Sequence, residues 1–306
     1  MFTASTILFL HAETSVHVGS GESHGAVDLA IQREQHTGFP VAPASGVKGA
    51  VRSWFADQNG ATDRHTAAFG PDTSNAGDHA GAIAFTDARL LLFPVQSMTG
   101  VFAWTTCPSV LRRLQRDLDA VGHTAASWDV PSPDEDEAIG TEANVNHTSQ
   151  SEVLLEERHF AFKSSEAANN VALWLNGNAI PGSEAYDYWS SSTGERLLIL
   201  HDDAFRDLVQ HATEVQARVK LNEQGTTGED GNLFYQENLP SDALLYAQLL
   251  AQDDLSGALG DGGGAEALLR YIRTLDGNRL QIGGDASVGR GLTRVHFLGS
   301  DEEDTE

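Results

Sequence analysis

A glycine-rich segment near the N-terminus and another near the C-terminus hold the side chains best suited to chemistry. In the first segment, His17 and Asp28 supply an imidazole and a carboxylate, groups used for acid–base chemistry and for metal binding. Their spacing matches neither the HExxH motif nor a cysteine–histidine zinc motif. The pattern alone therefore assigns no metal site to this segment.

The second segment, 284–291, has the outline of a phosphate-binding P-loop but lacks two of its functional groups. Arg290 stands where a lysine is required, and Gly291 stands where a serine or threonine would bind magnesium. Residues 292–297 alternate in polarity as a strand does, whereas a P-loop opens a helix. An NTPase is therefore not expected. A turn whose N–H groups and arginine contact a phosphate backbone, and a plain turn between elements, both remain open.

Two further patterns have both a structural and a functional interpretation. The pair His201-Asp202 occurs in metal phosphohydrolases, but no matching upstream histidine motif is present, and an aspartate before a helix is typical of an N-cap. The apolar spacing over 47–55 predicts a helix that begins at Ser45 as N-cap and runs to Ala56. Lys48 and Arg52 then share one flank of this helix, either as solvated cations or beside an anion at its N-terminus.

The composition is strongly acidic, with 19 cationic and 44 anionic residues and a net charge of −25 over 306 residues. Lysine is nearly absent, since only Lys48, Lys163 and Lys220 occur. Solubility explains such acidity in part, but carboxylates combined with arginine in place of lysine also favour an acidic, halophile-like protein. The charge alone argues against a nucleic-acid partner. In concentrated salt, however, long-range repulsion is screened and only local contacts count.

Cysteine content and hydropathy indicate the cellular compartment of the protein. A single cysteine, Cys107, excludes an intramolecular disulfide framework. No apolar run approaches the ~20 residues that span a bilayer, and the apolar stretch 7–10 has no basic segment before it. We therefore expect a cytoplasmic protein without a membrane partner.

The elements that position these residues are strands interleaved with single helices. This order predicts an α+β fold with a mostly antiparallel sheet, in a single domain that covers 1–306. Within it, 122–150 holds few large apolar residues and is expected to be an acidic, mobile insertion or a linker. The range 215–238 predicts a hairpin with a protruding connection, and 298–306 is an acidic tail. Strands are expected at 5–11, 82–85, 89–93, 101–104, 154–162, 197–200 and 292–297, and helices at 45–56, 108–118 and 265–275.

Taken together, these segments resemble the RAMP superfamily. The run Asp-Leu-Ala-Ile-Gln-Arg at 28–33 continues into Pro-Ala-Ser-Gly-Val-Lys-Gly-Ala-Val-Arg at 43–52, and both parts are similar to the family signature. The segment 85–95 and the glycine loop 284–291 fit the same family. The combination is similar to the repeated backbone subunit of the type III-B CRISPR effector, the Cmr complex.

This resemblance implies a modified RRM-like (ferredoxin-like) palm with insertions and a β-hairpin thumb, for which 215–238 is the candidate. Such subunits stack head to tail on guide CRISPR RNA beside other type III-B subunits, and the guide pairs with single-stranded target RNA. The residues matched to guide contacts are Arg33, Ser45, Lys48, Arg52, Arg218, Gly284, Gly289, Arg290 and Gly291.

The resemblance also implies a metal-dependent endoribonuclease that acts within the assembled complex and cuts target RNA at regular intervals. Asp28 matches the family's cleavage position and is the candidate ligand of a divalent ion, Mg or Mn, bound together with RNA. His17 matches a second position in the same loop system. Four alternatives remain open. The chain could be a non-catalytic scaffold subunit that binds guide RNA, a related RAMP subunit such as a type III-A backbone protein or a guide-processing endonuclease, or an acidic halophilic enzyme of unknown substrate. The fourth is a structural role for Asp28 in organising its loop.

Overall fold

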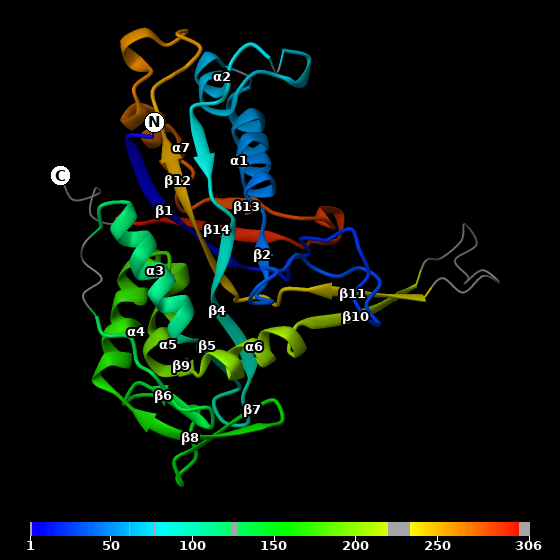
Figure 1. Ribbon diagram of the computed structural model, residues 1–306, viewed down its shortest axis with the longest axis vertical. Coiled ribbons are helices and arrows are strands. Elements are labelled where there is room, and N and C mark those ends of the chain that lie inside the picture. Colours follow the sequence, from blue (N-terminus) through cyan, green and yellow to red (C-terminus); the bar gives the residue numbers. More distant parts are fainter. Residues whose placement is uncertain (1, 61, 76, 124–127, 220–232, 300–306) are drawn as a thin grey trace.

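The computed structural model describes residues 2–60, 62–75, 77–123, 128–219 and 233–299 (Figure 1). The helices are α1 (Ala44–Asn59), α2 (Asp63–Phe69), α3 (Pro108–Ala120), α4 (Glu166–Asn178), α5 (Asp187–Arg196), α6 (Asp202–His211) and α7 (Ala265–Arg273). The strands of the main sheet are β1 (Ala4–Ala12), β2 (Val41–Ala42), β3 (Ile83–Phe85), β4 (Ala88–Gln96), β5 (Phe102–Thr106), β6 (Glu137–Gly140), β7 (Glu152–Leu155), β8 (Arg158–Ser164), β9 (Leu197–Leu200), β12 (Leu244–Ala251), β13 (Arg279–Gln281) and β14 (Leu292–Phe297).

The main sheet is mixed but mostly antiparallel, which confirms the predicted α+β class. Its strand order over the described residues is β13-β14-β1-β12-β4-β5-β9-β6-β8-β7, with β2 paired to β4 and β3 paired to β12. Within this part of the chain, the parallel pairs are β5–β9 and β6–β8. Every described helix is too short or too polar to cross a bilayer.

The centre of the sheet is buried along β1 because its neighbours are strands on both sides and helices pack against it. Residues Ile7 to Leu10 are fully buried, with Ile7 opposite Gln248 of β12 and Leu10 opposite Val295 of β14. Helix α7 packs on β1 and β12. Burial of this kind is the main stabilising term for the sheet.

Helix α1 confirms the predicted apolar stripe but not its predicted start. Val47, Val51 and Phe55 are fully buried, and the helix packs on β3 and β13. Ser45 was expected as N-cap, and this is wrong: Pro43 is the N-cap, and Ser45 lies inside the first turn. The reason is a tertiary contact, since the Asp87 carboxylate accepts a hydrogen bond of 2.8 Å from the Ala44 N–H.

The hairpin expected over 215–238 is confirmed as a pair of strands, β10 (Glu214–Val219) and β11 (Leu233–Asn238). They form a separate two-stranded sheet that projects from the main sheet in Figure 1. The expected connection at its tip, 220–232, lies outside the described residues.

The acidic segment 122–150 was expected to be a mobile insertion or a linker, but part of it is built into the main sheet. It contributes β6, which lies between β9 and β8, and Trp128 before it is 7% exposed. Glu137 of β6 pairs with Lys163 of β8. Residues 124–127 of the segment and the tail from residue 300 lie outside the described residues.

Candidate nucleic-acid interface

Asp28 lies on the long connection between β1 and β2, and that connection is hydrogen-bonded to β11. Its Oδ2 accepts a hydrogen bond of 2.8 Å from the Tyr235 N–H. In return, the Tyr235 carbonyl accepts hydrogen bonds from the N–H groups of Asp28 and Leu29, at 3.1 and 3.0 Å. Asp28 is exposed, so its carboxylate is held in place on one side and open to solvent on the other.

His17 contacts the same strand two residues further along. Its Nδ1 lies 2.7 Å from the carbonyl oxygen of Glu237. Because a carbonyl can only accept, Nδ1 carries the proton in a neutral ring, and Nε2 then presents a lone pair. The His17 carbonyl in turn accepts a hydrogen bond of 2.9 Å from the Gly284 N–H. His17 therefore joins the N-terminal loop, β11 and the glycine loop.

The glycine loop connects β13 to β14 as a turn between antiparallel strands, and β14 confirms the strand predicted after it. Gly291 has φ +77°, and a Cβ there would lie 2.1 Å from the Ile282 carbonyl oxygen. Gly283 has φ +81°, and a Cβ there would lie 2.3 Å from the His17 carbonyl. These two positions require glycine because backbone atoms occupy the space of a side chain.

Arg218 and Arg290, both predicted to contact RNA, meet at one carboxylate, that of Asp285. Arg218 Nη1 lies 2.7 Å from Asp285 Oδ2, and Arg290 Nε lies 3.9 Å from the same oxygen. Gln236 of β11 also donates to this oxygen, at 2.6 Å. The hydrogen bonds from Gln236 and Arg218, in that order, hold the pKa of Asp285 below its usual value despite partial burial.

Arg33, also predicted to contact RNA, is engaged inside the protein. Its guanidinium lies 2.5 Å from the Glu237 carboxylate and donates to the carbonyls of Gly38 and Val209. The Glu237 carboxylate also accepts from the Ile31 N–H, at 3.1 Å. This ion pair is nearly buried, and it fastens the segment after Asp28 to β11.

Lys48 and Arg52 lie together on α1 but form a group separate from the hairpin. Lys48 Nζ donates to the Ile83 carbonyl at 2.8 Å, and Arg52 contacts the carbonyl of Pro71 and the carboxylate of Asp72. Burial, and secondarily the nearby Arg52 charge, lower the pKa of Lys48. None of these contacts reaches the described part of the hairpin. Figure 1 shows α1 and the hairpin extending in different directions.

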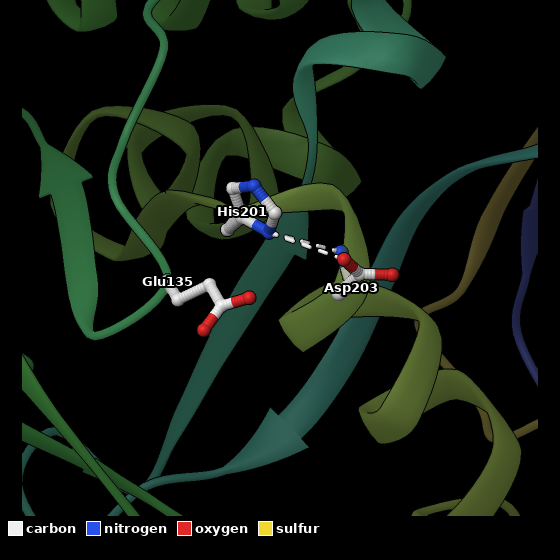
Figure 2. Close-up of side chains that lie close together, drawn as sticks. All are labelled: Glu135, His201 and Asp203. Atoms are coloured by element: carbon white, nitrogen blue, oxygen red, sulfur yellow. Dashed lines mark hydrogen bonds and ion pairs between the residues drawn. The ribbon is translucent and has the colours of Figure 1, made fainter.

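A metal ion needs several ligands close together, and Asp28 has no such neighbours in the part of the chain that the structure describes. Among the described residues, three metal-ligating side chains gather within 4.8 Å at Glu135, His201 and Asp203, and Asp28 belongs to no such group (Figure 2). His201 Nδ1 caps α6 by accepting from the Asp203 N–H, and the Asp203 carboxylate pairs with Arg206 at 2.9 Å. The chain's own residues around Asp28 therefore do not make a metal site by themselves.

Sequence reasoning missed the residues that connect the predicted ones. Tyr235, Gln236 and Glu237 are consecutive on β11, and each contacts a different segment: the Asp28 loop, Asp285, and His17 with Arg33. Tyr235 and Glu237 act largely through backbone atoms, for which the sequence has no signal. The Glu237 carboxylate left only a weak signal, an acid near the end of the predicted hairpin 215–238.

Comparisons with known proteins identify the family of the chain. The sequence matches the RAMP superfamily over residues 9–294. It is 35% identical to the CRISPR system Cmr endoribonuclease Cmr4 of Pyrococcus furiosus, over 94% of this chain and 93% of that protein. The crystal structure of oligomeric Cmr4 from Pyrococcus furiosus superposes with a TM-score of 0.73 at 29% identity, covering 96% of this chain and 97% of that one.

A subunit of the type III-B Cmr-beta complex bound to cognate target RNA shares the fold, with a TM-score of 0.71 at 20% identity over 97% of this chain and 98% of that one. The superfamily match covers most of the chain, and the 35% identical relative spans nearly its full length. The chain therefore belongs to the RAMP superfamily and, within it, to the Cmr4 subunits of type III-B CRISPR effectors.

Proposed function

We propose that this chain is the repeated backbone subunit of a type III-B effector, which binds guide RNA and cleaves complementary target RNA. The observation that carries the proposal is that β11 of the hairpin contacts both the β1–β2 connection, through Asp28 and His17, and the glycine loop, through Asp285. Its 35% identical relative is named as an endoribonuclease of the Cmr system. Copies of the chain, other subunits and both RNA strands are its partners.

The hairpin is the proposed thumb of an RRM-like palm. Its face with Val215, Val219, Leu233 and Tyr235 is unusually exposed for apolar side chains, at 41–55%. The four residues lie on one side, because Val219 is opposite Leu233 and residue 217 is opposite Tyr235. Such a face can pack on unstacked bases, whose exposure costs a few kcal/mol per step.

Cleavage is proposed to proceed through the ribose 2′-hydroxyl beside the scissile phosphate. The 2′-oxygen forms a bond to phosphorus, the bond from phosphorus to the 5′-oxygen breaks, and the leaving oxygen takes a proton from water. Asp28 accepts the 2′-hydroxyl proton in this scheme, and the lone pair on His17 Nε2 is a second acceptor. The Asp28 carboxylate alone does not hold a metal ion, and a chelator in the assay tests whether RNA completes a metal site there.

Guide binding is proposed to use Lys48 and Arg52 on α1 and a close approach of the RNA backbone to the glycine loop at Gly289, where a Cβ would meet no atom within 4 Å. The N–H groups of Gly284 and Gly289 already donate within the protein. The proposed RNA contacts act at short range, as an acidic protein requires. Arg290 contributes mainly by holding the loop in shape, since its side chain is 13% exposed and engaged with Ser15, Gln216 and Asp285.

The decisive experiment compares Asp28→Asn with the wild-type chain, each assembled on guide RNA with its sister subunits. The expected result is normal assembly with loss of target cleavage. Assembly with cleavage at the wild-type rate would overturn the catalytic role. A wild-type assembly that binds target but never cuts would instead identify a non-catalytic scaffold subunit.

A further inference from the structure

Asp285 is the residue of the glycine loop that reaches the hairpin. It follows Gly284 with φ +62°, and it is one of five described non-glycine residues with positive φ. Glycine occupies such positions without strain, and the same loop uses glycine at positive φ three times, at 283, 289 and 291. The aspartate at 285 is therefore expected to make side-chain contacts that a glycine could not make.

The Asp285 side chain makes such contacts, because it bridges two strands. Oδ2 accepts from Arg218 of β10 at 2.7 Å and from Gln236 of β11 at 2.6 Å. Arg218 also donates to the Gln236 side-chain oxygen. The carboxylate therefore closes a cluster of three side chains at the base of the hairpin, and its charge strengthens both hydrogen bonds.

Arg290 extends this cluster to the N-terminal loop. Its Nη1 donates to Ser15 Oγ at 2.7 Å, its Nη2 donates to Gln216 of β10, and its Nε lies 3.9 Å from Asp285. All three guanidinium nitrogens thus face protein groups. The hairpin base is fastened to the glycine loop on both of its strands.

The cluster lies one residue away from the hydrogen bond that holds Asp28. Gln236, which contacts Asp285, directly follows Tyr235, whose N–H holds the Asp28 carboxylate. A change in the tilt of β11 relative to the glycine loop would therefore move Asp28 relative to any RNA on that loop. Displacements of about 1 Å can lower a rate by about 100-fold.

We propose that Asp285 is a positioning residue for target cleavage: by tying Arg218 and Gln236 to the glycine loop, it sets the distance between loop-bound RNA and Asp28. This inference rests on the proposed function, since it assigns Asp285 a role in that reaction. Asp285 itself touches neither the reacting phosphate nor the 2′-hydroxyl in this scheme.

The test uses Asp285→Gly, which keeps the positive φ without strain, and Asp285→Asn, which keeps the shape but loses the charge. Asp261→Gly, at an exposed site away from the hairpin, is the charge-matched control. Three quantities are compared in the assembled complex: guide affinity, single-turnover cleavage rate and the position of the cuts. Asp285→Gly should cut about tenfold or more slowly with guide affinity within about threefold of wild type, Asp285→Asn should lie between, and Asp261→Gly should match wild type.

A parallel loss of guide binding and cleavage would overturn the proposal, because Asp285 would then act in RNA binding. Unchanged cleavage would also overturn it. Hydrogen exchange on the isolated full chain supplies a readout without RNA: amides of 233–238 should exchange faster in Asp285→Gly, and unchanged exchange there counts against the proposal. If the proposed function itself is wrong, the result is different: either the Asp28→Asn complex still cleaves target RNA, or the wild-type complex does not cleave it.

Discussion

The Tyr235 N–H lies 2.8 Å from Asp28 Oδ2, and the Tyr235 carbonyl accepts two N–H groups from the same loop. Both polar backbone groups of Tyr235 therefore face the Asp28 loop, which leaves the pair it forms with Ala217 of β10 without cross-strand hydrogen bonds. The candidate catalytic carboxylate is thus placed by the edge of the hairpin. Movement of the hairpin on RNA would carry Asp28 with it.

Tyr235→Pro removes the N–H that holds Asp28, a donor that the ladder with β10 does not use. It also removes the phenol ring, so Tyr235→Ala, which loses the ring but keeps the N–H, is the matched control. We expect target cleavage by Tyr235→Pro to be about tenfold slower than by this control, which corresponds to about 1.4 kcal/mol of barrier. Single-turnover cleavage in the assembled complex measures this. Tyr235→Phe keeps the N–H and should cut normally. A Tyr235→Pro complex with the wild-type rate would show that this hydrogen bond does not matter for cleavage.

Alanine substitutions at Gly291 and Gly289 form a matched pair that tests the backbone packing of the glycine loop. Both glycines have positive φ, +77° and +79°, but a Cβ at 291 would lie 2.1 Å from the Ile282 carbonyl oxygen, whereas nothing lies within 4 Å at 289. Gly289→Ala should cost about 1–2 kcal/mol of unfolding free energy from backbone strain alone. Gly291→Ala should cost clearly more, measured by denaturant unfolding. Equal losses of unfolding free energy in the two variants would mean that the Ile282 backbone shifts to accommodate the Cβ without a measurable loss of stability.

Lys48→Ala tests the proposed guide contact on α1. We expect guide affinity to fall about tenfold, or about 1.4 kcal/mol, with no change in which guide sequences are accepted, because a phosphate contact carries no sequence information. Filter binding with several guides measures both. Lys163→Ala removes the same charge at an exposed lysine paired with Glu137 and serves as control. If the two substitutions lower guide affinity equally, Lys48 contributes only through its overall charge and does not contact the guide.

Acid should destabilise the protein through His11. Burial lowers the pKa of this residue from 6.5 to about 4, against the opposing effect of Asp242 and Glu13. The unfolded chain therefore takes up a proton below pH 6.5 while the folded one stays neutral until about pH 4. Stability should fall across this window by about 3 kcal/mol, and none of this loss should occur above it.

The check for His11 is a comparison of unfolding free energies at pH 7 and pH 4.5 for wild type and His11→Phe. The phenyl ring suits the site, where His11 is surrounded by Trp104, Tyr186 and Trp189, and it cannot titrate. The acid loss should shrink in His11→Phe and stay unchanged in His36→Gln, which alters an exposed histidine. An equal loss in all three proteins would assign the effect to other groups.

Periodicity predicted the elements with one buried face, and it failed where burial or length hid the signal. The stripe of Val47, Val51 and Phe55 predicted α1, and the alternation over 292–297 predicted β14. The central strand β12 was missed, because it is buried on nearly every residue and its run Leu-Leu-Tyr-Ala-Gln-Leu-Leu-Ala has no period of two. The seven-residue α2 was not predicted, since so short a helix shows little periodicity.

The candidate site was predictable in its parts but not in its arrangement. Asp28, His17 and the glycine loop were found by residue type and by resemblance, and the structure brings them together at β11. Their partners were not predictable, because the Tyr235 N–H and the Glu237 carbonyl exist in any sequence. Arg33 shows the converse: a cation expected to face RNA is satisfied by an internal carboxylate.

Low salt should unfold this protein, because 44 acidic residues face only 19 basic ones. Their repulsion acts over about 10 Å at 0.1 M salt but only about 3 Å at 1 M. Salt also weakens attractive pairs, yet nearly buried ones such as Arg33–Glu237 are screened little. Melting temperature should therefore rise steeply with KCl. Sucrose stabilises proteins because it is excluded from their surface, and it does not screen charge. Sucrose should therefore not restore the stability that is lost at low KCl. A melting temperature that does not change with KCl concentration would exclude salt adaptation.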